Sequence, residues 1–428
     1  MSLMMKILKD LIPLNRVICS KDYDKTIEYL LNILPFKVVE HHAGDDYNGW
    51  VIPPKWDVKE AKIIKDGNVI YDGKWHALAV ISLSRSFRGK VGLDELKKHL
   101  YYDHRYDDSI TFHFRQLFRS WNRDWGFCVP KKFYDNLQEG EYEVLIETDE
   151  SDGVLKILEY THEGSLDETF IFGANLDHPG VANDGLAGSV VGIELCRRLS
   201  SKKTKFSYKL VLVQGIIGSE YYLGKMNEAE RNNIFEGVFL EMLGSQTQLA
   251  LQSSKDGKSN IEYALNKAMK ALGSSFRSGS FESIILNDEY IWEAYGIPMT
   301  SLSRFPYPEY HSERDNLSIM SKQSLDEALD ILEKAVDILE SSLLVYKKFK
   351  GNICLSNPKY DLYIDPGQVA FGDKTDDIRK KMRLLMDLIP TLQQPVTIKS
   401  LADRVGLDVI VVSSYLHRWA EKCLLDIK

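Results

Sequence analysis

The sequence lacks the features that mark secreted and membrane-spanning proteins. Its five cysteines are far apart and show no paired spacing, so we expect reduced thiols and a cytoplasmic protein. The apolar stretch near the N-terminus is broken by Lys6, Lys9, Asp10 and Pro13, and we therefore expect no signal peptide. No apolar run is long enough to span a bilayer, which predicts a soluble protein without membrane contact.

The sequence also has no excess of basic over acidic residues. The formal net charge is -8 over 428 residues, which disfavours the whole chain as a binder of nucleic acid or anionic lipid. Hydrophobic residues make up 44% and charged residues 27%, a balance typical of folded globular domains. A chain of this length exceeds what one hydrophobic core usually organises, so we expect two or three domains.

The N-terminal third combines one helix with a small β domain. The segment Asp22 to Leu34 has apolar residues at helical spacing. From Trp50 to about Glu147, short β-rich runs alternate with turn signals such as Asp66-Gly67. The tryptophans of this region could line a ligand groove, but nothing polar converges with them, and we favour a core role. They are Trp50, Trp56, Trp75, Trp121 and Trp125.

From about residue 153, strand and helix patterns alternate. This alternation predicts an α/β fold with a mostly parallel central sheet covered by helices. In such sheets ligands bind beyond the carboxyl ends of the strands, so the chemistry is expected there. The predicted strands are Thr169 to Asn175, Tyr208 to Gln214, Gly237 to Met242 and Ile297 to Leu302; the predicted helices are Gly188 to Leu199, Glu220 to Met226, Ile261 to Leu272 and Ser324 to Leu344.

The C-terminal tail predicts a helix-turn-helix, with a wing. Its helices are expected at Asp376 to Leu388, Ile398 to Val405 and Val409 to Glu421, with a turn at Gly406. The last helix offers only His417, Arg418 and Lys422 to phosphates. We therefore place protein contacts or intramolecular packing ahead of DNA binding, which would need a clustered basic face.

Three strand ends carry residues of the kind that bind a divalent metal. His178 and Asp184 follow the first predicted strand of the sheet, Glu241 closes another, and His311 follows the last. Alone, such a histidine is usually a hydrogen-bonded loop residue, and Asp184 would be a helix cap. Together they match the nitrogen and carboxylate ligands that zinc prefers.

Other chemistries find no support in the sequence. It has no G-x-S-x-G elbow, no phosphate-binding Walker loop, no dinucleotide-binding glycine fingerprint after a strand and no H-E-x-x-H zinc motif. The predicted α/β region contains three histidines, His162, His178 and His311, and only the last two lie where strand ends converge. The metal hypothesis therefore rests on few residues.

The candidate ligands belong to a set of short motifs. They are His178-Pro179, Asn183-Asp184-Gly185, Gln214-Gly215, Gly218-Ser219-Glu220-Tyr221-Tyr222-Leu223, Leu240-Glu241-Met242-Leu243-Gly244, Asn287-Asp288-Glu289, Tyr310-His311-Ser312 and Asp315. In these motifs the chain resembles the di-zinc aminopeptidase superfamily, in particular its bacterial aminopeptidase-like branch with an inserted β domain and a C-terminal winged helix. The likeness covers nearly the whole chain and implies a zinc exopeptidase-like fold. It divides the chain into an N-terminal helical part (1–48), the inserted domain (49–152), the catalytic core (153–348) and the winged helix-turn-helix (349–428).

The resemblance implies metal-site roles and also shows departures. By position, Asp184 matches a zinc-bridging aspartate, Glu241 an acidic ligand and His311 a histidine ligand. Asn175 stands where the superfamily has its first histidine ligand, and Leu212 and Val213 stand where it has a Glu-Glu pair. A site short of ligands favours one zinc ion, held by His178, Asp184 and His311, with Glu241 as a fourth ligand or a neighbour of the ligands.

The remaining candidates would bind substrate or move protons. Glu220 is the first choice for general base, with a helix-start glutamate as the plain alternative. Asp288 and Glu289 would receive a substrate ammonium or be ordinary turn acids. Arg304 would meet an oxyanion or a substrate carboxylate, and Tyr310 is expected beside the substrate.

The expected function is hydrolysis of an amide next to a free amine, in a peptide or an amino-modified small molecule. The alternative is a non-catalytic metal-binding or regulatory scaffold that uses its helix-turn-helix for protein or DNA contacts. The missing Glu-Glu pair favours that alternative. The oligomeric state, a homo-oligomer included, stays open.

Overall fold

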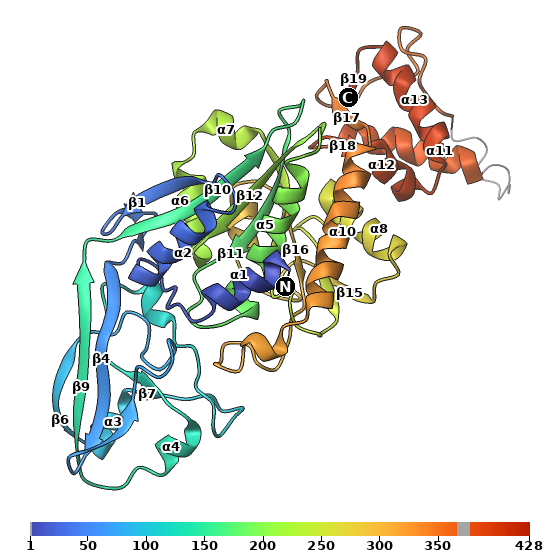
Figure 1. Ribbon diagram of the computed structural model, residues 1–428. Helices are drawn as coiled ribbons and strands as arrows, with labels where there is room; N and C mark the ends of the chain where they lie inside the picture. Colours follow the sequence, from blue (N-terminus) through green and yellow to red (C-terminus); the bar gives the residue numbers. More distant parts are fainter. Residues whose placement is uncertain (1, 366–376) are drawn as a thin grey trace. The chain divides into compact units, whose positions relative to one another are not determined.

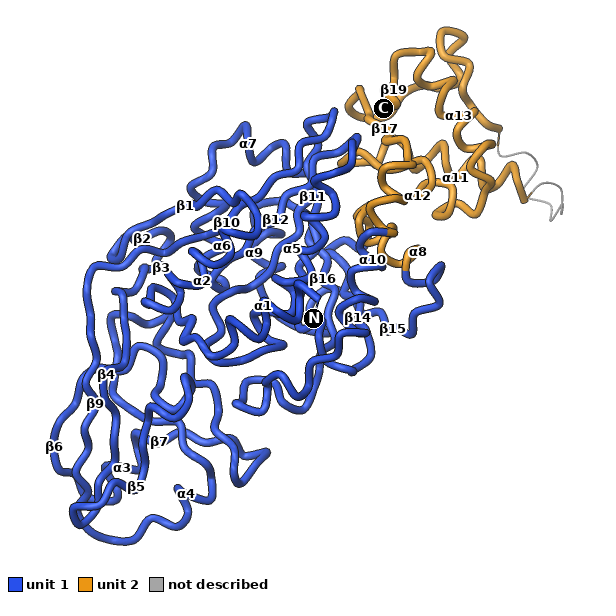
Figure 2. Tube along the Cα trace, in the orientation of Figure 1, with its two compact units in different colours: residues 1–257, 269–333 blue, residues 258–268, 334–428 orange. Residues whose placement is uncertain are grey.

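The computed structural model describes residues 2–365 and 377–428. The contacts within the chain divide it into two compact units (Figure 2). One comprises residues 1–257 and 269–333, and the other comprises residues 258–268 and 334–428. Among the described residues, no helix has the length and apolar character needed to cross a bilayer.

The first unit is built around an eight-stranded mixed sheet (Figure 1). Its strands are β1 (Lys37–His42), β10 (Val154–His162), β11 (Thr169–Asn175), β12 (Ser207–Val213), β13 (Ile234–Glu241), β14 (Leu249–Gln252), β15 (Phe276–Gly279) and β16 (Met299–Ser303). They lie in the order β1-β10-β12-β11-β13-β16-β14-β15. The four central strands, β12, β11, β13 and β16, run parallel, so their carboxyl ends meet at one edge.

The central strands are apolar because both faces of the sheet are covered. Every residue of β11, β12 and β13 is buried. The chain passes from β11 to β12 on one side and then back across β11 to β13. Right-handed crossovers therefore place α5 (Gly188–Leu199) and α6 (Gly215–Lys225) on opposite faces. This confirms the predicted α/β class with a helix-covered sheet.

One predicted helix begins earlier than expected. We placed the start of α6 at Glu220, after a corner at Gly218-Ser219, but the helix starts at Gly215. The chain turns at Gly215, whose φ of +51° is a conformation that glycine adopts at little cost. Glu220 therefore lies in the second turn of the helix, where the helix dipole gives it little stabilisation.

Other helices complete the first unit. The N-terminal apolar stretch forms a helix that buries Met4, Ile7, Leu8 and Leu11, which the sequence reading did not predict. The helix predicted at Asp22 is present, with its N-cap at Ser20. The helices of this unit also include α7 (Glu228–Asn232) and α9 (Glu289–Ala294), beside α1 (Leu3–Leu11) and α2 (Lys21–Leu31). Most of α8 (Asn260–Ala271) belongs to the second unit, and α10 (Lys322–Glu340) begins in the first unit and ends in the second.

A second, four-stranded antiparallel sheet forms the inserted region of the first unit. Its order is β5-β4-β9-β6. Two long strands, β4 and β9, form its middle, and β9 leads directly toward β10 of the central sheet (Figure 1). Its elements are β4 (Lys55–Lys65), β5 (Asn68–Asp72), β6 (Phe87–Gly92), α3 (Leu93–Lys98), β7 (Leu100–Tyr101), β8 (Phe127–Cys128), α4 (Lys131–Asp135) and β9 (Glu141–Ser151).

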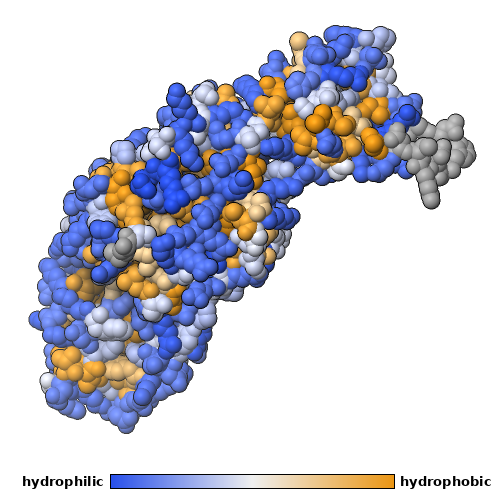
Figure 3. Space-filling model, turned by 45° about the vertical axis from the view of Figure 1, so that its right-hand side comes forward, coloured by the Kyte–Doolittle hydropathy of each residue, from blue (hydrophilic) through white to orange (hydrophobic). Residues whose placement is uncertain are grey.

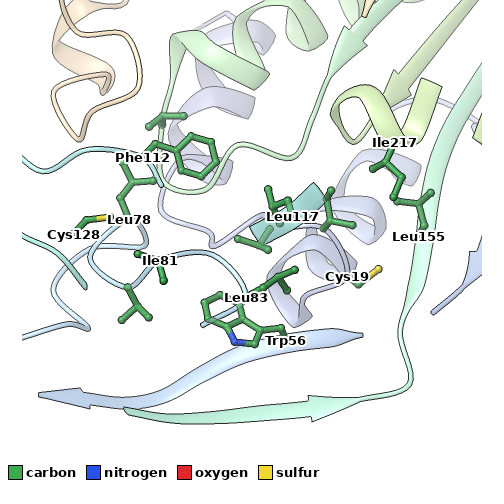
Figure 4. Packing of buried hydrophobic residues seen from close by; sticks show 14 of the residues in the cluster. Cys19, Trp56, Leu78, Ile81, Leu83, Phe112, Leu117, Cys128, Leu155 and Ile217 are labelled. Atoms are coloured by element: carbon green, nitrogen blue, oxygen red, sulfur yellow. The ribbon is translucent and has the colours of Figure 1, made fainter. Parts of the chain in front are cut away.

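The inserted region shares one hydrophobic cluster with the central sheet. Trp56 and Leu83 pack in the insert, while Leu155 and Ile217 belong to the sheet and its helix (Figure 4). The prediction that the tryptophans are core residues holds for Trp56 and for Trp125, which are 0% and 8% exposed. It is wrong for Trp75 and Trp121, which are 51% and 64% exposed.

The second unit contains the predicted helix-turn-helix. Its helices are α11 (Asp377–Leu388), α12 (Ile398–Val405) and α13 (Val409–Glu421). Asp376, the predicted start of α11, lies outside the described residues. Gly406 ends α12 in the left-handed conformation at φ +67°. A three-stranded sheet accompanies them, made of β17 (Leu344–Lys347), β18 (Val396–Thr397) and β19 (Leu425–Ile427).

Candidate metal centre

The loop that carries His178 and Asp184 depends on two glycines. Gly185 has a φ of +74°, and a Cβ atom there would lie 2.7 Å from Nδ1 of His178. At Gly188 a Cβ would lie 1.9 Å from the carbonyl oxygen of Leu240, on the neighbouring strand β13. Only glycine fits these two close approaches. The loop therefore turns tightly enough to bring Asp184 over the edge of the sheet.

Asp315 fixes the backbone of this loop. Its carboxylate accepts hydrogen bonds from the backbone N–H groups of Asn183 and Asp184, at 2.6 and 2.9 Å, and from the hydroxyl of Tyr307 at 2.6 Å. Asp315 is itself fully buried. It ties the segment after β16 to the segment after β11, so the two parts of the site are joined independently of any metal.

Arg16 supports the same loop from the other side. Its guanidinium is buried and donates to the backbone carbonyls of Leu176, His178 and Val181, and also to that of Leu11. Burial lowers the pKa of Arg16 to about 10, so it stays charged at neutral pH. A buried cation surrounded by carbonyl oxygens rigidifies the loop that presents His178.

The structure brings His178, Asp184 and His311 together. One ligand atom from each lies within 4.8 Å of the other two. Oδ2 of Asp184 is 3.1 Å from Nε2 of His311 and 3.5 Å from Nε2 of His178. The side chains of Asp184, His178 and His311 are 9%, 14% and 20% exposed. The group is therefore mostly enclosed but open to a small ligand.

The backbone at His311 is in an uncommon conformation. His311 has a φ of +55°, in the left-handed region that residues with a Cβ rarely adopt. Its ring stacks on Tyr310 with centroids 3.8 Å apart. Strained backbone of this sort persists where the surrounding structure determines it, and it is common at functional sites.

The charges in this group compensate one another. Burial disfavours the charged form of His178, but Asp184 and Asp177 outweigh it and raise the pKa of His178 to about 9. Burial likewise acts to raise the pKa of Asp184, and the two histidines reverse this and lower it. Nδ1 of His178 lies 3.4 Å from Asp177, while Nε2 faces Asp184. The carboxylate of Asp177 therefore orients the ring through the nitrogen that does not face Asp184.

These residues fit a divalent cation. Oδ2 of Asp184 is buried and finds no hydrogen-bond partner among the described residues, although two imidazole nitrogens face it. A divalent cation bound between Asp184 and the imidazoles would take the place of the imidazole protons and would give this buried oxygen a direct bond. Two nitrogens and one carboxylate are a ligand set typical of zinc, with a further position left open.

A second buried acidic group lies at the same edge of the sheet, and we call Glu241, Asp288 and Glu289 the acidic chamber. They are 5%, 0% and 1% exposed. Both carboxylate oxygens of Glu241 and of Glu289 lack hydrogen-bond partners in the part of the chain that the structure describes. Burial and then Glu289 raise the pKa of Glu241 well above its usual range, and burial also raises that of Glu289. Burial raises the pKa of Asp288 to about 7.

Glu241 does not join the three ligands. The cluster of ligand atoms within 4.8 Å contains His178, Asp184 and His311, and within residues 2–365 and 377–428 no other such group occurs. Glu241 ends β13 and interacts with Glu289 instead. The expectation that Glu241 is a fourth ligand or a neighbour of the ligands stays a prediction, and in this structure Glu241 belongs to the acidic chamber.

Two other candidates have partners outside the histidine pair. Oε1 of Glu220, the expected general base, accepts hydrogen bonds from Nδ2 of Asn48 and the hydroxyl of Tyr295, at 3.0 and 2.9 Å. The guanidinium of Arg304 pairs with Glu327 and donates to the carbonyl of Thr247. Arg304 is therefore engaged in holding the fold together.

The sequence reading missed several residues that shape this site. Arg16 and Asp177 gave no motif of their own, and Asp315 was noted only as part of a pattern. Phe112, from the inserted region, lies with its ring centroid 5.5 Å from that of His178 and 5.3 Å from that of His311. The nearest sequence signal for Phe112 was the alternation in Phe112-His113-Phe114, which is too common to indicate a site.

Comparison with known proteins places the fold and the family. The fold is that of the zinc aminopeptidases: BSAP, a zinc aminopeptidase from Bacillus subtilis, superposes with a TM-score of 0.57 at 17% identity over 78% of this chain and 94% of that chain. The chain belongs to the family described as a domain of unknown function, DUF4910, which matches residues 5–342.

Both a solved structure and a curated relative from Clostridium acetobutylicum are similar to this chain. The crystal structure, of a protein named provisionally as a peptidase, matches with a TM-score of 0.76 at 23% identity, over 99% of this chain and 96% of that chain. The curated relative is 28% identical over 341 residues, which cover 78% of this chain and 77% of that protein. It is named provisionally as a polysaccharide biosynthesis protein with an aminopeptidase-like domain.

Proposed function

We propose that this chain is a zinc-dependent hydrolase of the aminopeptidase type, which cleaves an amide next to a free amine in a peptide or an amino-modified small molecule. The observation that carries the proposal is the convergence of His178, Asp184 and His311, with an unpartnered carboxylate oxygen between two imidazole nitrogens. A bound zinc ion supplies Lewis-acid polarisation of a carbonyl group at this place.

One ion fits the ligands better than two. Asn175 has no imidazole to offer, and Leu212 and Val213 are fully buried aliphatic residues within β12. A second ion would have to be held by the acidic chamber without any of the three ligands. We therefore assign a single ion to His178, Asp184 and His311, and we keep the chamber for the substrate.

The acidic chamber would bind the free amine. Glu241 and Glu289 are buried beside each other with their oxygens unpaired, so an ammonium group that enters gains hydrogen bonds and relieves their repulsion. The same bonds hold the amide next to that amine in a fixed position. Tyr310 flanks this arrangement through its stacking on His311.

Proton transfer is assigned to the chamber in place of Glu220. Oε1 of Glu220 already accepts two hydrogen bonds. Oδ2 of Asp288, in contrast, has no partner among the described residues, and Oδ1 accepts from the hydroxyl of Ser219. Because burial raises the pKa of Asp288 to about 7, this group exchanges a proton readily at neutral pH.

Metal content and turnover test this proposal together. We expect about one zinc per purified chain by elemental analysis, and chelator-sensitive cleavage of some member of a panel of aminoacyl fluorogenic amides and N-acylated amino sugars. His311→Ala is expected to lose both metal and turnover. His42→Ala, at an exposed histidine of β1, is the matched control and is expected to keep both.

A metal-free chain without turnover would point to the second candidate, a regulatory scaffold. The buried aliphatic pair at Leu212 and Val213 favours it, since carboxylates are absent there. The first turn of α13 also favours it, because Val409, Ile410 and Val411 are 39%, 76% and 40% exposed. Apolar side chains gather on the surface of this unit (Figure 3), which suits protein contacts better than a phosphate backbone.

A further inference from the structure

The inserted region reaches the metal centre through one strap, residues 105–118. The strap pairs with the segment that carries His311: the N–H of Phe112 donates to the carbonyl of His311 at 2.9 Å, and Thr111 forms a β-bridge with Ser312. The carboxylate of Glu313 accepts from the hydroxyl of Ser109 at 2.7 Å and from the N–H of Ile110 at 2.8 Å. The strap is thus fixed against the ligand loop.

The strap places two aromatic rings against the ligands. The centroid of Phe112 lies 5.5 Å from that of His178 and 5.3 Å from that of His311, both edge to face. Phe114 lies 5.2 Å from His311 in the same manner. Both histidines of the candidate metal centre therefore contact a ring that the inserted region supplies.

From the metal centre outward, the aromatic rings form one row in which each ring contacts the next. Phe112 contacts Phe114 at 5.4 Å, Phe114 contacts Phe118 at 6.2 Å, and Phe118 contacts Trp50 at 5.9 Å between ring centroids. Phe112 is buried, at the margin of the hydrophobic cluster (Figure 4). The other three rings are partly exposed. Apolar surface that continues from a polar centre toward solvent is typical of a binding wall.

We propose that Phe114 and Phe118 form the wall that receives the substrate side chain next to the scissile amide, so that the inserted region sets the specificity of the centre. The substrate class is then an amide of an amino acid with a large apolar side chain, aromatic or branched aliphatic. This inference rests on the proposed function, because it needs a ligand held at the metal centre. The evidence for the inference is separate, because the ring contacts of the strap concern the side chain that the ligand carries.

The wall has a plain alternative, which is packing alone. In that case the rings would only hold the strap on the His311 segment, and their removal would weaken folding or metal binding without changing the preference among ligands. The two roles differ in their effect on selectivity. A wall that buries a large side chain gains roughly 10- to 200-fold in affinity over a ligand that lacks it.

The test uses the full chain loaded with zinc and the hydroxamates of phenylalanine, leucine, alanine and glycine, which chelate zinc through the same group. Calorimetric affinities are expected to favour the phenylalanine and leucine compounds over the glycine compound by about 10-fold or more. Phe114→Ala is expected to remove most of this ratio while zinc and the glycine hydroxamate still bind. Phe133→Ala, in α4 against Tyr71, is the matched control and should keep the ratio.

Phe118→Ala covers the case in which Phe114→Ala does not fold. Phe118 has no ring contact with either histidine, and its removal is expected to weaken the phenylalanine compound more than the leucine compound. The proposal of a wall is wrong if the zinc-loaded parent protein binds all four hydroxamates equally. It is also wrong if the variants keep the parent's ratio of affinities. A parent chain that binds no zinc contradicts the proposed function itself, and the two failures are thereby distinguished.

Discussion

Two buried polar clusters of the first unit differ in one respect. The first, Glu159 with Lys209 and Tyr222, is closed: the hydroxyl of Tyr222 donates to Glu159 at 2.6 Å, and the ammonium of Lys209 lies 3.3 Å from the same carboxylate. Burial acts to raise the pKa of Glu159, but these partners reverse it and lower the pKa. The second, at the carboxyl edge of the sheet, leaves oxygens of Asp184, Glu241 and Glu289 without a hydrogen bond within the described chain, although two imidazoles lie beside Asp184.

This difference distinguishes buried charges that stabilise the fold from buried charges that bind a ligand. A closed cluster satisfies each buried group internally and needs nothing further. In an open cluster, buried carboxylates without partners destabilise the folded protein. We expect such a cluster where a bound cation or cationic ligand offsets this loss of stability. The comparison predicts that changes in the closed cluster alter stability alone, and that changes in the open cluster alter binding.

The largest effect is expected from removing a ligand of the open cluster. His311→Ala should weaken zinc binding by about 100-fold or more, because it removes one of only three protein ligands. In the parent, zinc at about 1,000 times its dissociation constant should stabilise the fold by about 4 kcal/mol. Thermal unfolding with and without zinc measures both quantities. An equal zinc-dependent shift in the variant would show that the ion binds elsewhere.

The next effect concerns the closed cluster. Lys209→Met should destabilise the protein by about 3 kcal/mol in chemical denaturation, because it removes the buried cation of Glu159 and leaves only the exposed Lys37 beside this carboxylate. Lys90→Met, in the exposed pair of Lys90 and Glu141, is the control and should cost less than about 1 kcal/mol. Both variants are expected to bind zinc like the parent. Loss of zinc binding in Lys209→Met would remove the distinction between the clusters.

The acidic chamber should give the metal-free protein a specific pH dependence. The pKa of Asp288 rises from 3.8 to about 7 on folding, so the folded state binds its proton more tightly than the unfolded state does. Its contribution to stability is complete below about pH 4 and is lost as the pH rises to about 7, a change of roughly 2–4 kcal/mol. Asp288→Asn should flatten this part of the stability curve. An unchanged slope of stability against pH in this variant would show that the raised pKa belongs to a group other than Asp288.

The smallest effect is a gain in stability. Glu289→Gln should stabilise the metal-free protein by about 1 kcal/mol at pH 8, since an amide of the same shape removes the repulsion with Glu241. The same change should weaken binding of a ligand's free amine, as a trade between stability and function. Glu141→Gln, on the exposed rim of β9, controls for charge removal and should leave both unchanged. A destabilised Glu289→Gln would mean that the carboxylate is already paired.

Much of the fold could be predicted because local signals and burial agree. The strand at Thr169 and the helices at Gly188, Ile398 and Val409 have the predicted bounds. The strand has an apolar run, and the last two helices begin at the capping side chains of Thr397 and Asp408. The start of α6 was misplaced because the glycine turn at Gly215 is indistinguishable in sequence from a glycine within a helix. The short strands β14 and β15 carried too few residues to give a period.

The three candidate ligands, His178, Asp184 and His311, could be named because each follows a predicted strand. Their supporting residues could not. Arg16 acts through backbone carbonyls, and Phe112 belongs to a strap separated from His311 by about two hundred positions, so only the folded chain brings them together. No sequence signal indicated the partners of Glu220 and Arg304, which the geometry engages with Tyr295 and Glu327.

Anomalous scattering at the zinc absorption edge, measured on crystals of the full chain grown with zinc, tests the central claim most directly. The account predicts one strong peak, bonded to Nε2 of His178, Nε2 of His311 and a carboxylate oxygen of Asp184, and no peak within the acidic chamber. Absence of a peak between these three side chains, or one held by Glu241 and Glu289 alone, would contradict it.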